Sequence, residues 1–424
     1  MKWVTSLSTK ISLEAAVQDL SQQVFALMGD RSLDLGFLFV STAFASDYPR
    51  LLPLLAEKLP IQKLIGCSGG GIVGNGQEFE DKPAIALLIG HLPNAEAKVF
   101  HLDDNQLPDL DSPPDRWEKI TDVDPTVSPS FVLVGDPFSF PINDLIQGLD
   151  FAYPNSVKVG GLASSGGMGA NALFCFHEEG KYKLYRTGLL GVALWGDVTI
   201  DPVVSQGCRP IGKILQVSEC ERNLILGLEG KPPLSLLQDT VGDLNPSDRE
   251  LAQHSLFIGV VMNEFKANPS QGDFLIRNII GVDPRSGAIA VGDRMRPGQR
   301  IQLHLRDGKA SAEDLEEALI NYSNQLNLEA PNVSATAALM FSCMGRGERL
   351  YGKPNFDSEI LQKHLGLIPF GGFFCSGEIG PVGGTTFLHG YTSVFGIVRP
   401  KKTYSPTVNG VISAPNLLLD FMFF

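Results

Sequence analysis

Apolar residues near the N-terminus recur at helical spacing, and a short continuous apolar run follows them. The apolar positions from Leu13 to Val24 are separated by four, three and four residues, and a capping serine precedes them. This pattern predicts an amphipathic helix over residues 12–28. The run at 35–40 holds no charged residue and is typical of a buried strand.

The same order of predicted elements occurs three times along the chain. In each case a buried strand is followed by a helix and then by a second strand that runs into glycines or other small residues. The three stretches are 35–71, 130–167 and 337–380. Self-similarity of this kind predicts an internally repeated fold, although a strand–helix–strand unit is common enough to recur by chance. The predicted fold class is α/β (mixed α+β), with β-sheets covered by helices.

A weakly apolar stretch and a domain boundary are predicted between the copies of the pattern. Residues 103–125 are acidic and rich in proline, which predicts a loop or linker that contributes nothing to the core. Between the second and third copies of the pattern lie further strands, a turn at 229–233 and a helix at 234–240. We place the main boundary near residue 220, which predicts domains at 1–220 and 221–398 and a C-terminal tail at 399–424.

The tail ends in an apolar segment, Asn416–Phe424. Such a terminus either packs on its own domain or docks on a partner or a membrane surface. Nine residues are too few to span a bilayer.

Composition narrows the class of protein. The chain has 424 residues, of which 43% are hydrophobic and 19% charged, so it can bury a large core. A net charge of −13 argues against a nucleic-acid partner. No secretory leader and no transmembrane run are visible, which favours a cytoplasmic protein. The six cysteines are scattered without metal spacing, which favours a reducing compartment and predicts no metal and no cofactor.

A glycine-rich turn at 66–71 contains letters typical of two catalytic or cofactor motifs. Gly66-Cys67-Ser68-Gly69-Gly70 matches the pattern of a serine nucleophile, and 69–74 matches a dinucleotide fingerprint. Both motifs require a helix directly afterwards, but a strand is predicted there. Cys67 and Cys375 remain candidate activated thiols, the latter with His389 as a base brought near by a hairpin. The alternative is that both are small buried side chains.

Glu378 is the only acid in the apolar, glycine-rich stretch 368–381. A carboxylate in such a stretch must be paired, hydrogen-bonded or functional. Arg346 is the candidate partner, either for Glu378 or for the carboxylate of a ligand. A purely structural Arg–Glu bridge is the alternative.

The stretch Pro369–Pro381, with Phe387-Leu388-His389 behind it, resembles the C-terminal half of FIST-domain proteins. The turn at 66–70 and the segment 160–166 look like the two marks of the N-terminal half, and Leu228–Pro233 resembles the start of the C-terminal half. The resemblance covers nearly the whole chain up to about residue 398. One departure is Gly390, where the family pattern has an asparagine.

The resemblance implies a sensory module of signal transduction that binds a small ligand, with amino acids suggested as ligands. The family occurs beside signalling output domains in bacteria, and in an F-box protein that recruits substrates for ubiquitylation. No kinase, cyclase or F-box segment is recognisable in this chain, so we expect it to act by binding an unidentified protein partner.

We therefore expect a non-catalytic protein whose glycine turns line a ligand cleft. Backbone N–H groups would hold a carboxylate with help from Arg346, and Glu378 would meet an amino group. The expected ligand-binding residues are Gly66, Cys67, Ser68, Gly69, Ser164, Ser165, Arg346, Gly371, Gly372, Cys375, Ser376, Gly377, Glu378 and His389. The alternatives are a scaffold or assembly factor that docks a partner through the tail, and a thiol or serine hydrolase that uses Cys67, Ser68 or Cys375.

Overall fold

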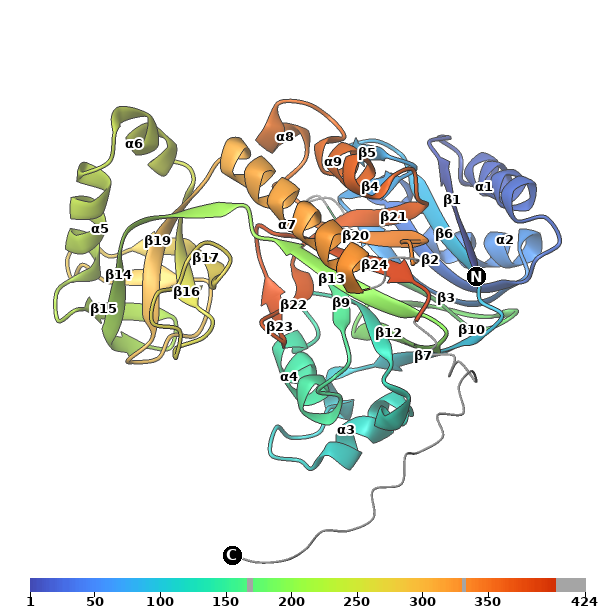
Figure 1. Ribbon diagram of the computed structural model, residues 1–424, viewed down its shortest axis with the longest axis horizontal. Coiled ribbons are helices and arrows are strands. Elements are labelled where there is room, and N and C mark those ends of the chain that lie inside the picture. Colours follow the sequence, from blue (N-terminus) through green and yellow to red (C-terminus); the bar gives the residue numbers. More distant parts are fainter. Residues whose placement is uncertain (166–170, 330–332, 402–424) are drawn as a thin grey trace, which may run out of the picture.

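Three six-stranded mixed sheets form a large body, and a smaller closed β-barrel lies beside it (Figure 1). The computed structural model describes residues 1–165, 171–329 and 333–401. The predicted mixed α/β class is confirmed. The body is built from three units with the same order of elements, and the barrel is inserted into the third unit.

Each unit begins with an edge strand and contains a pair of parallel strands. Unit 1 consists of β1 (Lys2–Ser8), α1 (Leu13–Met28), β2 (Leu33–Ser41), α2 (Tyr48–Lys58), β3 (Ile61–Gly69), β4 (Gly71–Gly74), β5 (Gln77–Glu80) and β6 (Ile85–His91). Unit 2 consists of β7 (Ala95–Leu102), α3 (Pro114–Thr121), β8 (Ser130–Gly135), α4 (Ile142–Ala152), β9 (Lys158–Leu162), β10 (Leu173–Glu178), β11 (Lys181–Tyr185) and β12 (Leu189–Gly196).

Unit 3 is interrupted by the barrel after its first strand. It consists of β13 (Thr199–Ser205), α7 (Gly308–Glu329), β20 (Ala337–Cys343), α8 (Glu348–Tyr351), α9 (Phe356–Leu365), β21 (Phe370–Cys375), β22 (Glu378–Val382), β23 (Thr385–His389) and β24 (Ser393–Arg399). The barrel segment consists of β14 (Cys208–Glu221), β15 (Leu224–Leu228), α5 (Pro233–Gly242), α6 (Pro246–Ala252), β16 (Leu256–Val261), β17 (Phe274–Val282), β18 (Ile289–Val291) and β19 (Arg300–Arg306).

The units exchange hairpins in a cycle. The strand orders of the sheets are β1-β6-β2-β3-β10-β11, β7-β12-β8-β9-β22-β23 and β13-β24-β20-β21-β4-β5. The hairpin of unit 1, β4–β5, therefore completes the sheet of unit 3. The hairpin of unit 2, β10–β11, completes the sheet of unit 1, and the hairpin of unit 3, β22–β23, completes the sheet of unit 2. The predicted internal repeat is confirmed, and the exchange explains why its units belong to one body.

One glycine in each parallel pair explains the recurring glycine-rich strand ends. It lies opposite a large residue of the neighbouring strand, and a Cβ atom there would come within 1.9–2.0 Å of that residue's carbonyl oxygen. The glycines and their partners are Gly66 with Leu38, Gly160 with Leu133, and Gly372 with Met340. Only glycine allows this close backbone approach.

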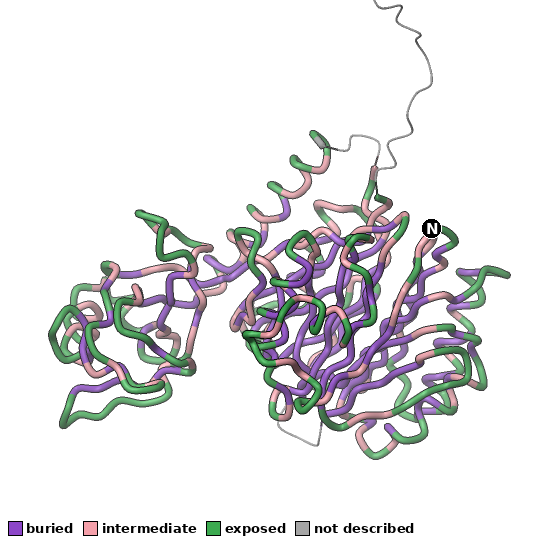
Figure 2. Tube along the Cα trace, turned by 90° about the horizontal axis from the view of Figure 1, so that it is seen from below, coloured by how far each residue is buried: buried purple, intermediate pink, exposed green. Residues whose placement is uncertain are grey.

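The three sheets enclose a common core, and each outer face is covered by the helices of its own unit. The inner core takes apolar side chains from all three sheets, including Phe39 and Phe373, whose rings stack 5.2 Å apart. Helices α1 and α2 cover the first sheet, α3 and α4 the second, and α7 and α9 the third. Figure 2 shows the buried residues gathered inside the body, with a second, smaller buried centre in the barrel.

The expectation that residues 103–125 add nothing to the core was wrong. The segment contains α3, and the side chain of Trp117 in this helix is fully buried. The indole packs where Gly148 of α4 leaves room for it. The proline-rich sequence hid the helix because Pro114 occupies its first position, where proline is well tolerated.

The predicted boundary near residue 220 falls inside β14, a barrel strand. Strands from both sides of this position share sheets, since β4 pairs with β21 and β9 pairs with β22. Most of the predicted tail, from residue 402 onward, lies outside the described residues. Among the described helices, none combines the length and the apolar character needed to cross a bilayer.

Candidate ligand-binding site

A cavity of about 380 Å³ lies where the β22–β23 hairpin meets the barrel. One wall is the turn that joins β21 to β22, from Cys375 to Glu378, together with His389 and Tyr391. The opposite wall comes from β17 of the barrel and from the loop after β18. The cavity therefore exists because unit 3 carries the inserted barrel.

Glu378, the first residue of β22, is fully buried at this cavity. Its Oε2 accepts a hydrogen bond from the backbone N–H of Thr392 at 3.2 Å, whereas its Oε1 has no partner among the described residues. Burial raises the pKa of the Glu378 carboxyl well above its usual value, against the opposing effects of the Thr392 N–H and the charges of Arg306 and Arg346. The cavity wall thus presents a buried carboxyl group with an unsatisfied oxygen.

His389 lies directly opposite Glu378 in the β22–β23 hairpin. Its Nε2 is 2.9 Å from the carbonyl oxygen of Gly380, which makes Nε2 the donor. Burial lowers the pKa of the ring to about 4, so the imidazole is neutral at pH 7. The predicted hairpin between Cys375 and His389 is present. In it, His389 occupies the cross-strand position opposite Glu378, and its ring is hydrogen-bonded to the backbone carbonyl of Gly380.

Three polar residues that the sequence analysis missed complete this region. Tyr391, with a φ of +65°, donates its hydroxyl to Oδ1 of Asn278, and both residues line the cavity. The guanidinium of Arg306 lies 4.9 Å from the centre of the Tyr391 ring. The Nε and Nη2 of Arg306 are buried and have no hydrogen-bond partner in the described part of the chain. Strained tyrosine backbone and unsatisfied donors next to a cavity are typical of functional regions.

Arg346 is paired with Asp357 and not with Glu378, which corrects the expectation from the sequence. Its Nε is 2.8 Å from Oδ2 of Asp357 and its Nη2 is 3.1 Å from Oδ1. Both side chains are essentially inaccessible to solvent, and neither lines the cavity. The bidentate pair ties the turn after β20 to the first turn of α9, so its evident role is structural.

The three glycine turns do meet, but they meet in the core. The N–H of Gly70 donates to Oγ of Ser164 at 2.8 Å, and the N–H of Ser164 donates to the carbonyl oxygen of Ser68 at 3.2 Å. The N–H of Ser376 donates to the carbonyl oxygen of Leu162 at 3.0 Å. Of the expected ligand-binding residues, those that line the cavity are Cys375, Ser376, Gly377, Glu378 and His389. Those that lie elsewhere are Gly66, Cys67, Ser68, Gly69, Ser164, Ser165, Arg346, Gly371 and Gly372.

The two candidate thiols are buried in the inner core. Burial raises the pKa of both Cys67 and Cys375 well above the usual value, the reverse of what activates a thiol. The Sγ of Cys375 donates a 3.5 Å hydrogen bond to the carbonyl of Phe373. Within residues 1–165, 171–329 and 333–401, no three His, Cys, Asp or Glu side chains gather to hold a metal ion.

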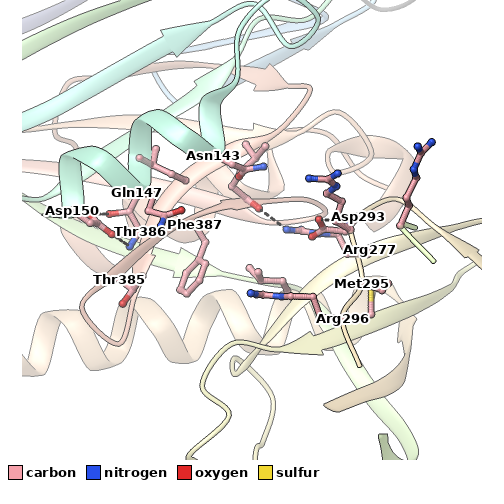
Figure 3. Close-up of a pocket in the computed structure, with 15 residues that line it drawn as sticks. Asn143, Gln147, Asp150, Arg277, Asp293, Met295, Arg296, Thr385, Thr386 and Phe387 are labelled. Carbon is pink, nitrogen blue, oxygen red and sulfur yellow. Dashed lines mark hydrogen bonds and ion pairs between the residues drawn. The ribbon is translucent and has the colours of Figure 1, made fainter. Parts of the chain in front are cut away.

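A second cavity of about 800 Å³ adjoins the first (Figure 3). The two share Asn143, Arg277, Asp293 and Leu388 in their walls, so together they form one cleft between the body and the barrel. The body side comes from α4 and β23, and the barrel side comes from β17 and two loops that carry arginines.

Comparison with known proteins decides the family. The FIST N domain matches residues 34–231, and the FIST C domain matches residues 233–381. The chain belongs to the FIST family. An uncharacterized protein of Mycobacterium tuberculosis is 36% identical over 367 residues, which cover 85% of this FIST protein and 89% of the relative. An uncharacterized protein of Mycobacterium bovis is 34% identical over 389 residues, covering 91% and 95%.

A shorter similarity involves a plant protein. An F-box/LRR-repeat protein of Arabidopsis thaliana is 36% identical over 124 residues, which cover 25% of this FIST protein and 22% of the relative. FIST domains are generally taken as sensory domains of signal transduction. The boundary between the two matched ranges lies at residues 231–233, inside the barrel segment. The FIST N match therefore includes the first two barrel strands, β14 and β15.

Proposed function

We propose that this FIST protein is a non-catalytic sensory module that binds a small molecule with a cationic amino group at Glu378. The observation that carries the proposal is the fully buried Glu378 carboxyl, whose Oε1 has no partner among the described residues and which borders a cavity of about 380 Å³. An unsatisfied buried acceptor costs free energy, on the order of 1–3 kcal/mol, which a ligand donor would recover.

An ammonium group fits this carboxyl better than a neutral donor does. Burial raises the pKa of the Glu378 carboxyl and so favours its neutral form. A cation at Oε1 reverses this preference, because an opposite charge favours the ionised carboxylate. Ligand binding then releases the proton of Glu378, and affinity rises as the pH rises towards the pKa of the free carboxyl.

An amino acid is the ligand class that we favour, because the protein offers an unsatisfied cation near the unsatisfied acid. Arg306 has two unpartnered N–H groups and lies over the ring of Tyr391, which lines the cavity. A small displacement of Tyr391 would expose this guanidinium to the carboxylate of a ligand whose amino group meets Glu378.

Position explains how such binding becomes a signal. The cavity has the body on one side and the barrel on the other, so a ligand contacts both. The chain connects them only through the segments around 206–208 and 306–308. Ligand occupancy would therefore fix the orientation of the barrel relative to the body, and a protein partner would recognise that orientation.

Thermal-shift measurements with the twenty amino acids test the site. The wild-type protein is expected to gain stability with at least one of them, because a ligand that binds only the folded state stabilises it. Glu378→Gln cannot form the carboxylate that would meet the amino group and is expected to abolish that gain. Glu250→Gln, at an exposed position of α6, makes the same chemical change away from the cavity and should retain it. An unchanged shift in Glu378→Gln would contradict the proposal.

Binding is favoured over catalysis by the state of the two candidate thiols. Both are buried, and the pKa of each is raised. Cys67 and Cys375 are therefore expected to resist acyl and thiol probes in the folded protein and to react only after unfolding. Rapid labelling of either residue, or of Ser68, in the native protein would restore the hydrolase hypothesis.

A further inference from the structure

We infer that the cavity of about 800 Å³ beside the Glu378 site binds the phosphate groups of a small phosphorylated molecule. Its barrel wall concentrates positive charge in a protein whose net charge is −13. Four arginines line it, namely Arg222, Arg277, Arg294 and Arg296. Arginine is the side chain best suited to phosphate because its planar fork donates several hydrogen bonds to oxygen.

Three of these arginines are available to a ligand. Among the described residues, no hydrogen-bond or ion-pair partner is found for the guanidinium groups of Arg222, Arg294 and Arg296. Arg277 is the exception, with its Nε 2.6 Å from Oδ2 of Asp293. Figure 3 shows Arg296 extending from the barrel side across the cavity towards Phe387.

Each acid in the wall is already paired with a cation of its own, so the three unpaired arginines keep their uncompensated charge. Asp293 accepts from Arg277 with one oxygen and from the backbone N–H of Arg294, at 2.7 Å, with the other. Asp150 accepts from Lys158 at 2.9 Å and from the hydroxyl and N–H of Thr386, each at 2.7 Å. The cavity therefore presents unpaired guanidinium groups and no unpaired carboxylate.

The loops that carry the free arginines are held in place by hydrogen bonds from their backbone N–H groups. The N–H of Met295 donates to the carbonyl of Arg222 at 2.7 Å, which joins the β14–β15 turn to the loop after β18. The N–H of Arg296 donates to Oε1 of Gln299, also at 2.7 Å. Free side chains on a fixed backbone lose little loop entropy when they close on a ligand.

The opposite wall has no net charge, because its one acid, Asp150, is paired with Lys158, and it suits the organic part of such a ligand. It offers the amides of Asn143 and Gln147 on α4, and the ring of Phe387 on β23 (Figure 3). A cationic wall that faces an amide and aromatic wall favours a molecule with a diphosphate at one end and a flat or polar group at the other. The volume is within the range of ordinary small-molecule sites.

Calorimetric titration of the full chain with pyrophosphate tests the inference. Binding is expected, and it should weaken as sodium chloride is added because the contacts are ionic. Arg222→Gln and Arg296→Gln are each expected to lower the affinity for pyrophosphate by about tenfold, as the loss of one charge-assisted contact does. Citrate, a polycarboxylate of similar charge, should bind more weakly than pyrophosphate.

Arg285→Gln is the matched control. It lies in the turn between β17 and β18, at the opposite end of that hairpin from the cavity, and it removes the same charge. Its affinity for pyrophosphate should stay within about twofold of wild type. The absence of pyrophosphate binding, an equal loss in Arg285→Gln, or tighter binding of citrate would each overturn the inference.

The inference stands apart from the proposed function because Glu378 does not line this cavity. Pyrophosphate affinity is expected to be unchanged in Glu378→Gln, even if no amino acid stabilises the protein. A loss of pyrophosphate binding in that variant would contradict a separate phosphate site.

Discussion

Two equivalent hairpins of the repeated body, β4–β5 and β22–β23, each carry a buried glutamate with one oxygen that has no partner among the described residues, and the two acids differ in what faces them. Glu78 on β5 accepts hydrogen bonds on Oε1 from the N–H and the hydroxyl of Ser358 in α9, both at 2.8 Å, and its Oε2 has no partner among the described residues. Glu378 on β22 receives one N–H on Oε2 and nothing on Oε1. Helix α9 of unit 3 closes over the first hairpin, whereas the second faces the barrel across a cavity.

The comparison teaches where function enters a repeated fold. Glycines at matched positions of the three units serve the close approach of parallel strands, and they are buried in the common core. The candidate site arises where the repeat is broken by the barrel insertion. Motifs that the three units share therefore report on architecture, and the inserted barrel, which only one unit has, creates the cavity beside Glu378.

The largest expected effect tests the shared glycines. Replacement of Gly66, Gly160 or Gly372 by alanine would press a Cβ against a backbone carbonyl at about 2 Å, and the sheet cannot yield without losing its pairing. Each change is expected to lower the free energy of unfolding by about 4 kcal/mol. Urea denaturation measures this, with Gly281→Ala as the control, since no atom lies within 4 Å of a Cβ there. Near-neutral behaviour at any of the three would break the structural equivalence.

Arg346 and Glu378 are predicted to respond with opposite signs. Arg346→Met leaves Asp357 buried without its ion-pair partner and is expected to cost about 3 kcal/mol of stability. Glu378→Gln replaces a poorly satisfied acid with a neutral amide and should stabilise the unliganded protein by roughly 1 kcal/mol. Thermal unfolding of the two variants measures both changes. Destabilisation by Glu378→Gln would mean that this acid, like Arg346, is a structural partner.

Glu78 offers an effect that depends on pH, on the order of 3 kcal/mol. Burial, with the nearby charge of Asp357, raises the pKa of Glu78 to about 7 from an ordinary value of 4.5. The folded state thus keeps a proton that the unfolded state releases, so this stabilisation is complete below pH 4.5 and is lost as the pH rises to about 7. Glu78→Gln should remove that decline in urea denaturation at a series of pH values. Glu250→Gln should retain the wild-type decline.

Much of the body was predictable from local sequence. The parallel strands and their connecting helices have long apolar runs and clear spacing, and these signals placed β2, β3, β8, β20 and most of the helices correctly. The exchanged hairpins were missed or only partly placed. A strand such as β4 is four residues long and finds its partner, β21, about 300 residues further on, so no local pattern marks it.

The candidate site was only partly predictable for the same reason. Glu378 stood out because an acid in an apolar, glycine-rich stretch needs an explanation. The partner of Arg346 could not be chosen, because Asp357 and Glu378 are both acids at plausible distances along the chain and only the fold decides between them. The cleft arginines could not be recognised from the sequence. Arg222 and Arg296 lie more than 70 residues apart in turn segments, and only the folded barrel brings their loops together.

The exchanged hairpins also impose a delay during synthesis on the ribosome, between the translation of a strand and the translation of its sheet partner. Ile72 of β4 pairs with Phe373 of β21, so its sheet partner is translated about 300 residues later. At the usual rate of protein synthesis this gap lasts roughly 15–60 s. Throughout that interval the nascent chain carries an apolar strand with an unpaired edge. A cell that makes this protein must shield that edge, and fragments that stop before β21 should bind chaperones or aggregate.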